Sequence, residues 1–254
     1  MQRITSLLST NKLSEMKRTI INVCLILFVT GCLFAQKSEQ ITVKAGTSIK
    51  DYFPLAERYL YPGFTEGKGI FNNGRIIPLM LNFNLLTCEM EFIQSKDTLF
   101  IAKKDELNSI VVAKDTFYYR GAYLQKISSG PISVYLKRKL EISDIRKQGG
   151  MGLENRSSSV DSYNMLLYNN GKLSVDLKIA NDIVFQKSVT YFYSTSGNDF
   201  IQFTRKNIIR AVPGKEDEIK NYIWTHQIDF ESREDVLFLA GFVSKLLSGN
   251  HGKS

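Results

Sequence analysis

Hydrophobic and polar positions alternate in short runs between Gly69 and Tyr119, and turn signals separate these runs. Asn72-Asn73-Gly74 lies between two apolar runs, and Asn-Gly supplies the positive φ angles that a tight hairpin needs. Gln94-Ser95-Lys96-Asp97 and Lys114-Asp115 are further turn signals. The pattern therefore predicts five or six consecutive strands of a β-meander.

A strongly alternating segment follows the meander and has the period of a half-buried strand. Arg138 falls on its apolar side, where it either extends its head to water along a packed stem or reaches a buried carboxylate. Later runs at 172–177, 183–193 and 200–203 resume the strand pattern. The alternating apolar positions are Ile132, Val134, Leu136, Leu140 and Ile142.

The segment 146–170 interrupts these strands. It is rich in Gly, Ser and Asn and shows no sustained period. Loops of this length are uncommon in compact domains unless they carry function. We therefore expect a long loop or a partly disordered one here, and a role in function.

The C-terminal quarter changes to a helical period. Ile219, Tyr222 and Ile223 share one face of a predicted helix, and its first turn is acidic at Glu216–Glu218, which suits the positive end of the helix dipole. Ser232 is expected to cap a second helix. That helix has an apolar stripe and is predicted to stop at Ser248-Gly249; the stripe is Val236, Leu239, Ala240, Val243, Leu246 and Leu247.

These patterns predict an α+β fold that is mainly β. We expect an antiparallel, meander-rich sheet or sandwich over 36–205. A C-terminal helical hairpin within 206–254 is expected to pack on it.

Residues 1–35 are expected to be an upstream extension followed by a signal peptide. Met16 suits a true start, because Lys17 and Arg18 form a basic segment before the apolar run 20–29. That run contains Asn22 and is shorter than the roughly 20 residues that span a bilayer. We therefore predict an exported protein.

The stretch TGCLFAQ at 30–36 allows two kinds of processing. Cleavage before Cys32 would leave a lipidated cysteine, and the protein would be anchored to the outer membrane. Cleavage after Ala35 would release a chain that begins at Gln36 into the periplasm or the medium. The apolar pair Leu33-Phe34 is a poor start for a polar tether, which favours release.

Charge and cysteine content narrow the picture further. The net charge is +8, and loss of residues 1–35, with four basic residues and one acidic residue, leaves +5. The basic residues are scattered, so no nucleic-acid partner is predicted. Cleavage after Ala35 also removes Cys24 and Cys32 and leaves Cys88 alone. No intramolecular disulfide is then possible, and the core must hold the fold.

Glu89 and Glu91 are the candidate catalytic residues. They share one face of a predicted strand about 7 Å apart, because two residues advance a strand by that length. This separation is compatible with acid and base catalysis on a glycoside. Alternating glutamates on a solvated strand face explain the same pattern.

Other catalytic constellations are not supported. A catalytic zinc usually needs three protein ligands, and the only histidines are His226 and His251. Cys88 is expected mid-strand as a buried thiol. The stretch Gly63–Gly69 suggests a phosphate loop, but it has one residue too few between its glycines and lacks the Ser or Thr that holds magnesium. We predict no cofactor and no metal.

The chain resembles a group of exported, uncharacterised proteins of Bacteroidota. The resemblance lies in the run YPGFTEGKGIFNNGRIIPLMLNFNLLTCEMEFIQSKDTLFIA at 61–102, in the tail IIRAVPGKEDEIKNYIWTHQIDFESREDVLFL, and in the LFAQ ending of the signal segment. It implies export and a similar fold. No activity or catalytic residue is assigned to the group, so none carries over.

We expect a non-enzymatic binding or scaffolding module whose partner is an envelope protein or a surface glycan. The sheet and the 146–170 loop are the expected contact surfaces. The alternative is a glycan-directed hydrolase that uses Glu89 and Glu91. Tyrosines suit recognition surfaces, although packing is their commoner role; the tyrosines considered are Tyr118, Tyr119, Tyr163, Tyr168, Tyr191 and Tyr193.

Overall fold

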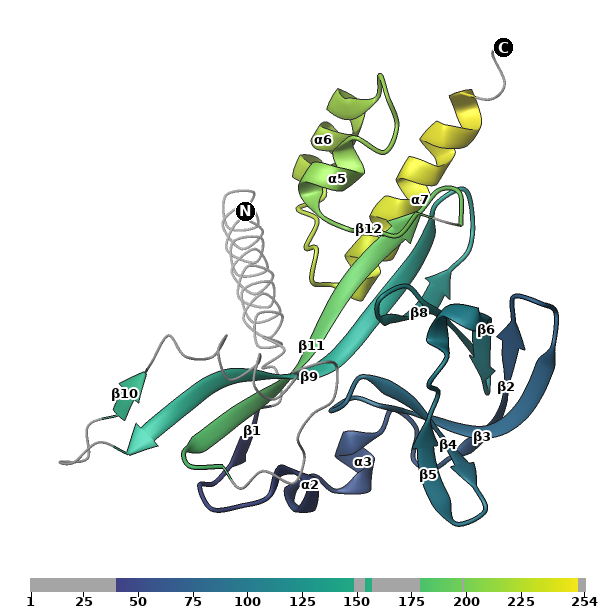
Figure 1. Ribbon diagram of the computed structural model, residues 1–254. Helices are drawn as coiled ribbons and strands as arrows, with labels where there is room; N and C mark the ends of the chain where they lie inside the picture. The colour runs from purple at the N-terminus through teal and green to yellow at the C-terminus, as the bar shows by residue number, and fades with distance from the viewer. Residues whose placement is uncertain (1–39, 149–153, 157–178, 198, 251–254) are drawn as a thin grey trace, which may run out of the picture. The chain divides into compact units, whose positions relative to one another are not determined.

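The computed structural model of the chain contains one open antiparallel sheet (Figure 1). The structure describes residues 40–148, 154–156, 179–197 and 199–250. Its strands are β1 (Gln40–Val43), β2 (Thr65–Phe71), β3 (Ile76–Asn84), β4 (Glu89–Gln94), β5 (Asp97–Phe100), β6 (Leu107–Val112), β7 (Asp115–Tyr119), β8 (Tyr123–Ser128), β9 (Ser133–Gln148), β10 (Glu154–Arg156), β11 (Asp182–Ser194) and β12 (Ile201–Gln202). They pair in the order β1-β11-β9-β8-β7-β6-β2-β3-β4-β5, with β10 beside β9 and β12 beside β11.

Short helices precede the meander, a 3₁₀ turn lies within it, and further helices follow the last strand. They are α2 (Ile49–Tyr52), α3 (Leu55–Arg58), the 3₁₀ turn η1 (Lys104–Glu106), α5 (Arg205–Ile209), α6 (Glu216–Thr225) and α7 (Arg233–Asn250). These elements confirm the predicted α+β class, mainly β, with antiparallel strands. Among the described helices, none has both the length and the apolar character to cross a membrane.

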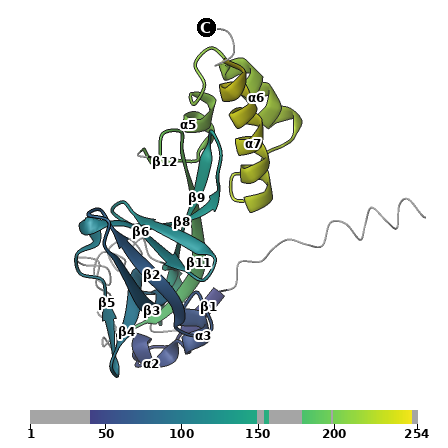
Figure 2. The same cartoon turned by 90° about the vertical axis from the view of Figure 1, so that its right-hand side faces the viewer.

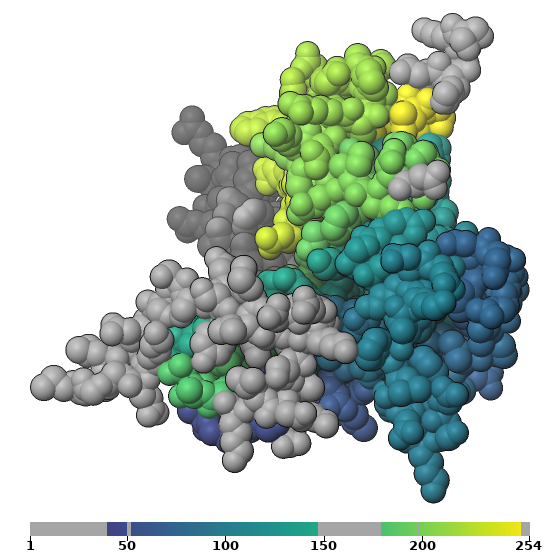
Figure 3. Space-filling view, in the orientation of Figure 1, coloured from purple at the N-terminus to yellow at the C-terminus, as the bar shows by residue number. Residues whose placement is uncertain are grey.

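The predicted meander corresponds to β2–β7. Gly74 has a φ of +82° in the β2–β3 turn, as the Asn-Gly signal requires. Strand β6 pairs with β2 instead of with β5, because the connection 101–106 carries the chain back from the edge of the sheet. Figure 3 shows the β4–β5 hairpin as the teal projection at the lower right.

Gly67 has a packing role that explains part of the glycine-rich stretch in β2. A Cβ atom at this position would collide with the Val111 carbonyl oxygen and would lie 2.9 Å from Leu81 Cδ1. Glycine therefore allows β2 and β6 to approach closely.

Two hydrophobic cores lie along the ladder formed by β9 and β11. In the first core, Leu140 and Phe185 of this ladder pack with residues of the meander and with Phe53 after α2. In the second core, Leu136 and Tyr191 of the same ladder pack with α5, α6 and α7. Figure 2 shows these three helices at one end of β9 and β11 and the meander at the other.

Arg138 lies between the two cores on β9. Its Nε donates a hydrogen bond to Gln125 Oε1 at 3.2 Å, and burial lowers the pKa of its guanidinium. Nearby, the Tyr61 hydroxyl donates to Asp115 Oδ2 at 2.7 Å. The predicted strand is confirmed, and Arg138 is bound by an amide oxygen. The polar side chain of Arg138 thus lies between the two cores on the strand that contributes to both.

The two predicted C-terminal helices are confirmed as α6 and α7. The Ser232 Oγ accepts a hydrogen bond from the Asp235 backbone N–H at 3.3 Å, as its predicted capping role requires. The predicted stop at Ser248-Gly249 is wrong, because α7 continues to Asn250. Gly249 does not adopt the positive φ that would end a helix at a glycine.

The structure describes part of the segment 146–170. Strand β9 continues to Gln148, and β10 pairs with it antiparallel, with Asn155 opposite Lys147. Two stretches within 146–170, namely 149–153 and the part from 157 onward, lie outside the described residues. The expectation of a functional loop there stays a prediction, as does the strand at 172–177.

Candidate functional site

Glu89 begins strand β4 and forms an ion pair with Lys104 of η1. The Glu89 side chain is 12% exposed, and the Lys104 side chain is 19% exposed. The Lys104 Nζ also lies 5.3 Å from the ring centre of Tyr119 and 5.9 Å from that of Tyr123. This carboxylate is therefore not on a solvated strand face. The β5–β6 connection brings the Lys104 cation to it, and Tyr119 of β7 and Tyr123 of β8 lie against that cation.

Glu91 is bound by a different set of groups. The Tyr59 hydroxyl donates to Glu91 Oε2 at 2.5 Å, and Asn84 Nδ2 donates to Oε1 at 2.9 Å. Burial and the hydrogen bond to Glu91 raise the pKa of Tyr59 to about 12. Glu91 thus ties the end of α3 to the β3–β4 hairpin. The two glutamates share a strand face as predicted, yet each has its own structural partners.

Cys88 precedes β4 and is not mid-strand as predicted. It has a φ of +56° in the β3–β4 turn, and its thiol is directed at the Leu85 carbonyl oxygen at 3.8 Å. Burial raises the pKa of the thiol to about 11, which keeps it protonated at neutral pH. The structure therefore favours a packing role for Cys88.

The tyrosines considered for recognition pack against other side chains where the structure describes them. Tyr118 contacts Tyr135 and Phe200, with ring centres 5.7 and 6.3 Å apart. Tyr119 lies 5.1 Å from Tyr123, and Tyr191 and Tyr193 belong to the second core. Tyr163 and Tyr168 lie outside the described residues.

Metal binding has no support in the part of the chain that the structure describes, since no three His, Cys, Asp or Glu side chains gather there. His226 caps the C-terminus of α6, and its Nδ1 lies 2.9 Å from the Tyr222 carbonyl oxygen. Its ring stacks on the Tyr222 ring at 4.0 Å. His251 lies outside the described residues.

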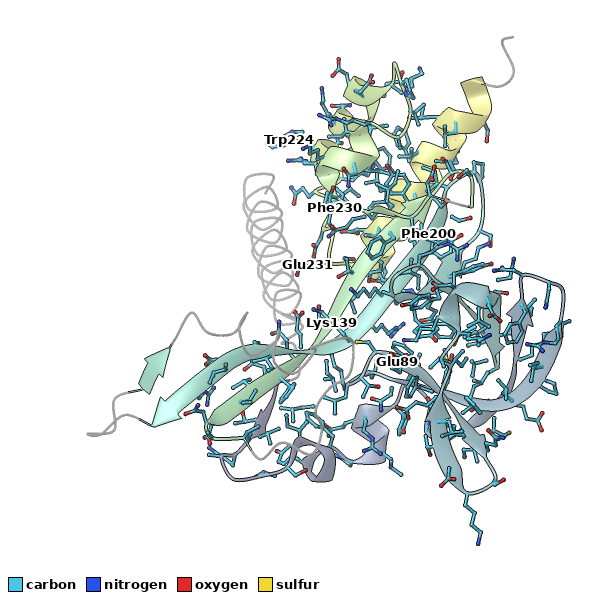
Figure 4. All side chains as sticks on the ribbon, in the orientation of Figure 1. Glu89, Lys139, Phe200, Trp224, Phe230 and Glu231 are labelled. Atoms are coloured by element: carbon cyan, nitrogen blue, oxygen red, sulfur yellow. The ribbon has the colours of Figure 1, made fainter. Side chains whose placement is uncertain are left out.

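A surface hollow lies beside α5 and α6, and unlike the surroundings of Glu89 and Glu91 it contains a highly exposed aromatic side chain. It has a volume of about 710 Å³, and its lining includes Arg205, Trp224, Gln227 and Phe230. Trp224 is 77% exposed, which is unusual for the largest apolar side chain. Figure 4 shows Trp224 projecting away from the helices, with Phe230 and Glu231 on the same side below it.

The local sequence explains why Trp224 is exposed. Ile219 and Ile223 form the buried stripe of α6, and Trp224 lies one residue beyond it. One residue turns a helix by about 100°, so the indole points away from the second core. This signal was present in the sequence, because the chain has a single tryptophan and it lies off the apolar stripe.

The end of α6 fixes one wall of the hollow. Gln227 has a φ of +48°, Gln227 N–H donates to the Trp224 carbonyl at 3.2 Å, and Ile228 N–H donates to the Ile223 carbonyl at 3.2 Å. This is the bonding of a Schellman motif, in which glycine is the usual residue at the positive-φ position. A glutamine therefore occupies a strained conformation at the hollow.

Arg205 connects this hollow with two smaller ones. It opens α5 behind its N-cap Thr204, whose side chain accepts from the Asn207 N–H. A hollow of about 500 Å³ adds Lys220, and another of about 350 Å³ reaches β11 and Glu231. Among the described residues, no carboxylate pairs with Arg205, whereas Lys220 pairs with Asp217 at 2.8 Å.

The arrangement joins an exposed indole, a half-buried phenyl ring, an amide and a guanidinium that no described carboxylate pairs, all on one surface. The guanidinium can bind a carboxylate in two parallel hydrogen bonds, and the rings can cover apolar groups. Helix α5 was not expected from the sequence, so the meeting of Arg205 with Trp224 was missed. Comparisons with protein-family models, curated proteins and solved structures find no match for the chain.

Proposed function

We propose that the protein is an exported, non-enzymatic binding module of the cell envelope, and that it binds a protein partner at the hollow around Trp224 and Arg205. The single observation that carries this proposal is the 77% exposed Trp224 beside an arginine that has no described carboxylate partner. Trp and Arg are enriched among the residues that contribute most to protein–protein binding.

The chemistry of the surface defines the partner. A carboxylate of the partner would bind Arg205, and an apolar side chain beside it would cover Trp224 and Phe230. Added salt should weaken the first contact more than the second, because screening acts on charges. The hydrolase that uses Glu89 and Glu91 stays an alternative prediction. The binding module is preferred, because Glu89 is held by Lys104 and Glu91 by Tyr59 in contacts that support the fold.

Affinity capture from a detergent-solubilised envelope of the source cells tests this function. We expect Trp224→Ala and Arg205→Ala to reduce the recovery of one specific partner at least tenfold, the scale of a residue central to an interface. Matched controls are Leu55→Ala, which removes another exposed apolar side chain, and Lys206→Ala, which removes the neighbouring cation. Both should capture like the parent.

Equal recovery with all four variants would reject this surface as the contact. The same fractions should be compared with Glu89→Gln and Glu91→Gln. Hydrolysis of an envelope glycan by the parent that both of these variants abolish would favour the enzyme instead.

A further inference from the structure

A second hollow lies in the meander and is independent of the Trp224 surface. It has a volume of about 600 Å³, within the range of small-molecule pockets. Strands β2, β3 and β4 and the connection from β5 to β6 contribute its lining. Most of the lining is apolar, as in pockets that hold apolar ligands; the apolar side chains include Phe71, Ile77, Leu79, Phe92, Ile101 and Leu107.

The β5–β6 connection is held in place beside this groove. At its start, the Ile101 N–H donates to the Met90 carbonyl at 3.3 Å. At its end, the Asn72 N–H donates to the Glu106 carbonyl at 2.9 Å, and Asn72 Nδ2 donates to the Asp105 carbonyl at 3.0 Å. Lys104 is fixed by its ion pair with Glu89. The groove therefore has walls that are largely preformed.

Arg75 places a positive charge at this groove. Its guanidinium carbon lies 4.7 Å from the ring centre of Phe71, and both residues contribute to the lining. Lys103, the other basic residue of the lining, pairs with Glu106 at 2.9 Å. No described carboxylate pairs with Arg75.

We propose that this groove binds a single acyl chain with an anionic head group. The chain would lie along Ile77, Leu79 and Phe92, and the head group would bind the Arg75 guanidinium. An apolar groove beside a cation that has no carboxylate partner among the described residues complements a ligand that is apolar along its length and negative at one end. Carboxylate and phosphate heads share this chemistry.

Isothermal titration calorimetry of the purified protein tests the proposal with dodecanoate, dodecyl phosphate and dodecanol below their aggregation limits. We expect one site per chain for the two anions and binding at least tenfold weaker for the alcohol. The anion that binds more tightly identifies the head group. Arg75→Gln should weaken binding of both anions about tenfold and leave dodecanol unchanged.

Two neighbouring residues of β3 provide a matched pair of variants. Ile77→Phe should fill the groove and remove binding of all three ligands. Ile76→Phe should bind like the parent, because Ile76 is 55% exposed and does not line the groove. Arg75→Gln changes an exposed side chain and keeps the test valid if Ile77→Phe does not fold.

Several results would overturn the proposal. These are the absence of dodecanoate and dodecyl phosphate binding, equal affinities for the anions and the alcohol, and equal effects of the two phenylalanine variants. A parent that is dimeric in sedimentation, with a monomeric Ile77→Phe variant and no ligand binding, would show that a second copy occupies the groove. None of these results affects the capture of a protein partner at the Trp224 hollow, so the two proposals can fail separately.

Discussion

The two cores of this protein are completed in different ways on the same β9–β11 ladder. The meander side contains buried or half-buried polar ties, such as Glu89 with Lys104, Glu91 with Tyr59, and Asp115 with Tyr61. The helical side is completed mainly by apolar stripes and stacked rings, such as Tyr222 on Phe242 at 3.9 Å.

This difference distinguishes charged side chains that the fold already binds from charged side chains that are open to a partner. On the meander side, the carboxylates that look catalytic in the sequence are already bound by neighbouring side chains. On the helical side, Arg205 and Trp224 remain open to solvent beside a hollow. A charged or aromatic side chain is a better candidate for partner binding when the fold itself does not use it.

The largest effect is expected from breaking the second core alone. Leu239 of α7 is fully buried, so Leu239→Asp would bury an unpaired carboxylate and cost several kcal/mol. Hydrogen exchange should then show rapid exchange in α6 and α7 and protection retained in β2–β4. Gly241→Asp is the control, because Gly241 is an exposed position of the same helix where an added Cβ atom meets no described atom within 4 Å beyond the local helix backbone, and it should cost less than about 1 kcal/mol. Loss of protection in both regions would mean that the cores unfold together.

A smaller effect is expected from breaking a polar tie of the first core. Lys104→Met leaves the largely buried Glu89 without its cation and should cost about 2 kcal/mol in urea unfolding. Lys103→Met breaks an exposed pair with Glu106 and should cost less than about 1 kcal/mol. If the two variants unfold at the same urea concentration, the Glu89–Lys104 pair does not stabilise the meander.

A surface tie at the edge of the first core should show a dependence on pH. Hydrogen bonds from Lys44 Nζ at 2.6 Å and the Ala45 N–H at 2.9 Å lower the pKa of Asp182. A carboxyl group with a lowered folded-state pKa stabilises the fold above its unfolded pKa of about 3.9, and this contribution is lost as the pH falls through the folded pKa.

We therefore expect Asp182→Asn to cost less than about 1 kcal/mol at pH 7, because the Lys44 partner is 70% exposed. The difference from the parent should shrink as the pH falls below about 4. Thermal unfolding at pH 7, 4 and 3 measures it. A difference that grows on acidification would contradict the assignment.

The smallest effect is a gain in stability at the Trp224 hollow. Gln227→Gly should stabilise the protein by about 0.5–1 kcal/mol, because glycine adopts a φ of +48° without the cost of a Cβ atom. Partner capture should nevertheless fall, since the Gln227 side chain lines the hollow. Unfolding and capture can be measured on one preparation. Unchanged capture would assign Gln227 a role in the turn alone.

Local patterns predicted the secondary structure well where it depends on the residues of a single element. The strands of the meander, the alternation through Leu136 and Leu140, and the buried stripe of α7 each follow from a period that the residues carry themselves. The pairing of β6 with β2 did not follow, because it depends on how the 101–106 connection returns. Strand order is a tertiary property that neither strand encodes alone.

The candidate sites were harder to predict for the same reason. The alternation of Glu89 and Glu91 showed that they share a face, but their partners Lys104 and Tyr59 come from other elements. Their burial could therefore not be read from β4. Trp224 was visible as an aromatic residue off a helical stripe, whereas its proximity to Arg205 depends on the packing of α5 against α6.

The single tryptophan allows the most direct test of the proposed binding surface. Protein labelled with 5-fluorotryptophan has one ¹⁹F resonance, and it reports on Trp224 even in a mixture with other proteins. The account predicts that the captured partner shifts or broadens this resonance and that Arg205→Ala reduces the change, while Lys206→Ala does not. An unchanged resonance at a partner concentration that saturates capture would contradict binding at Trp224.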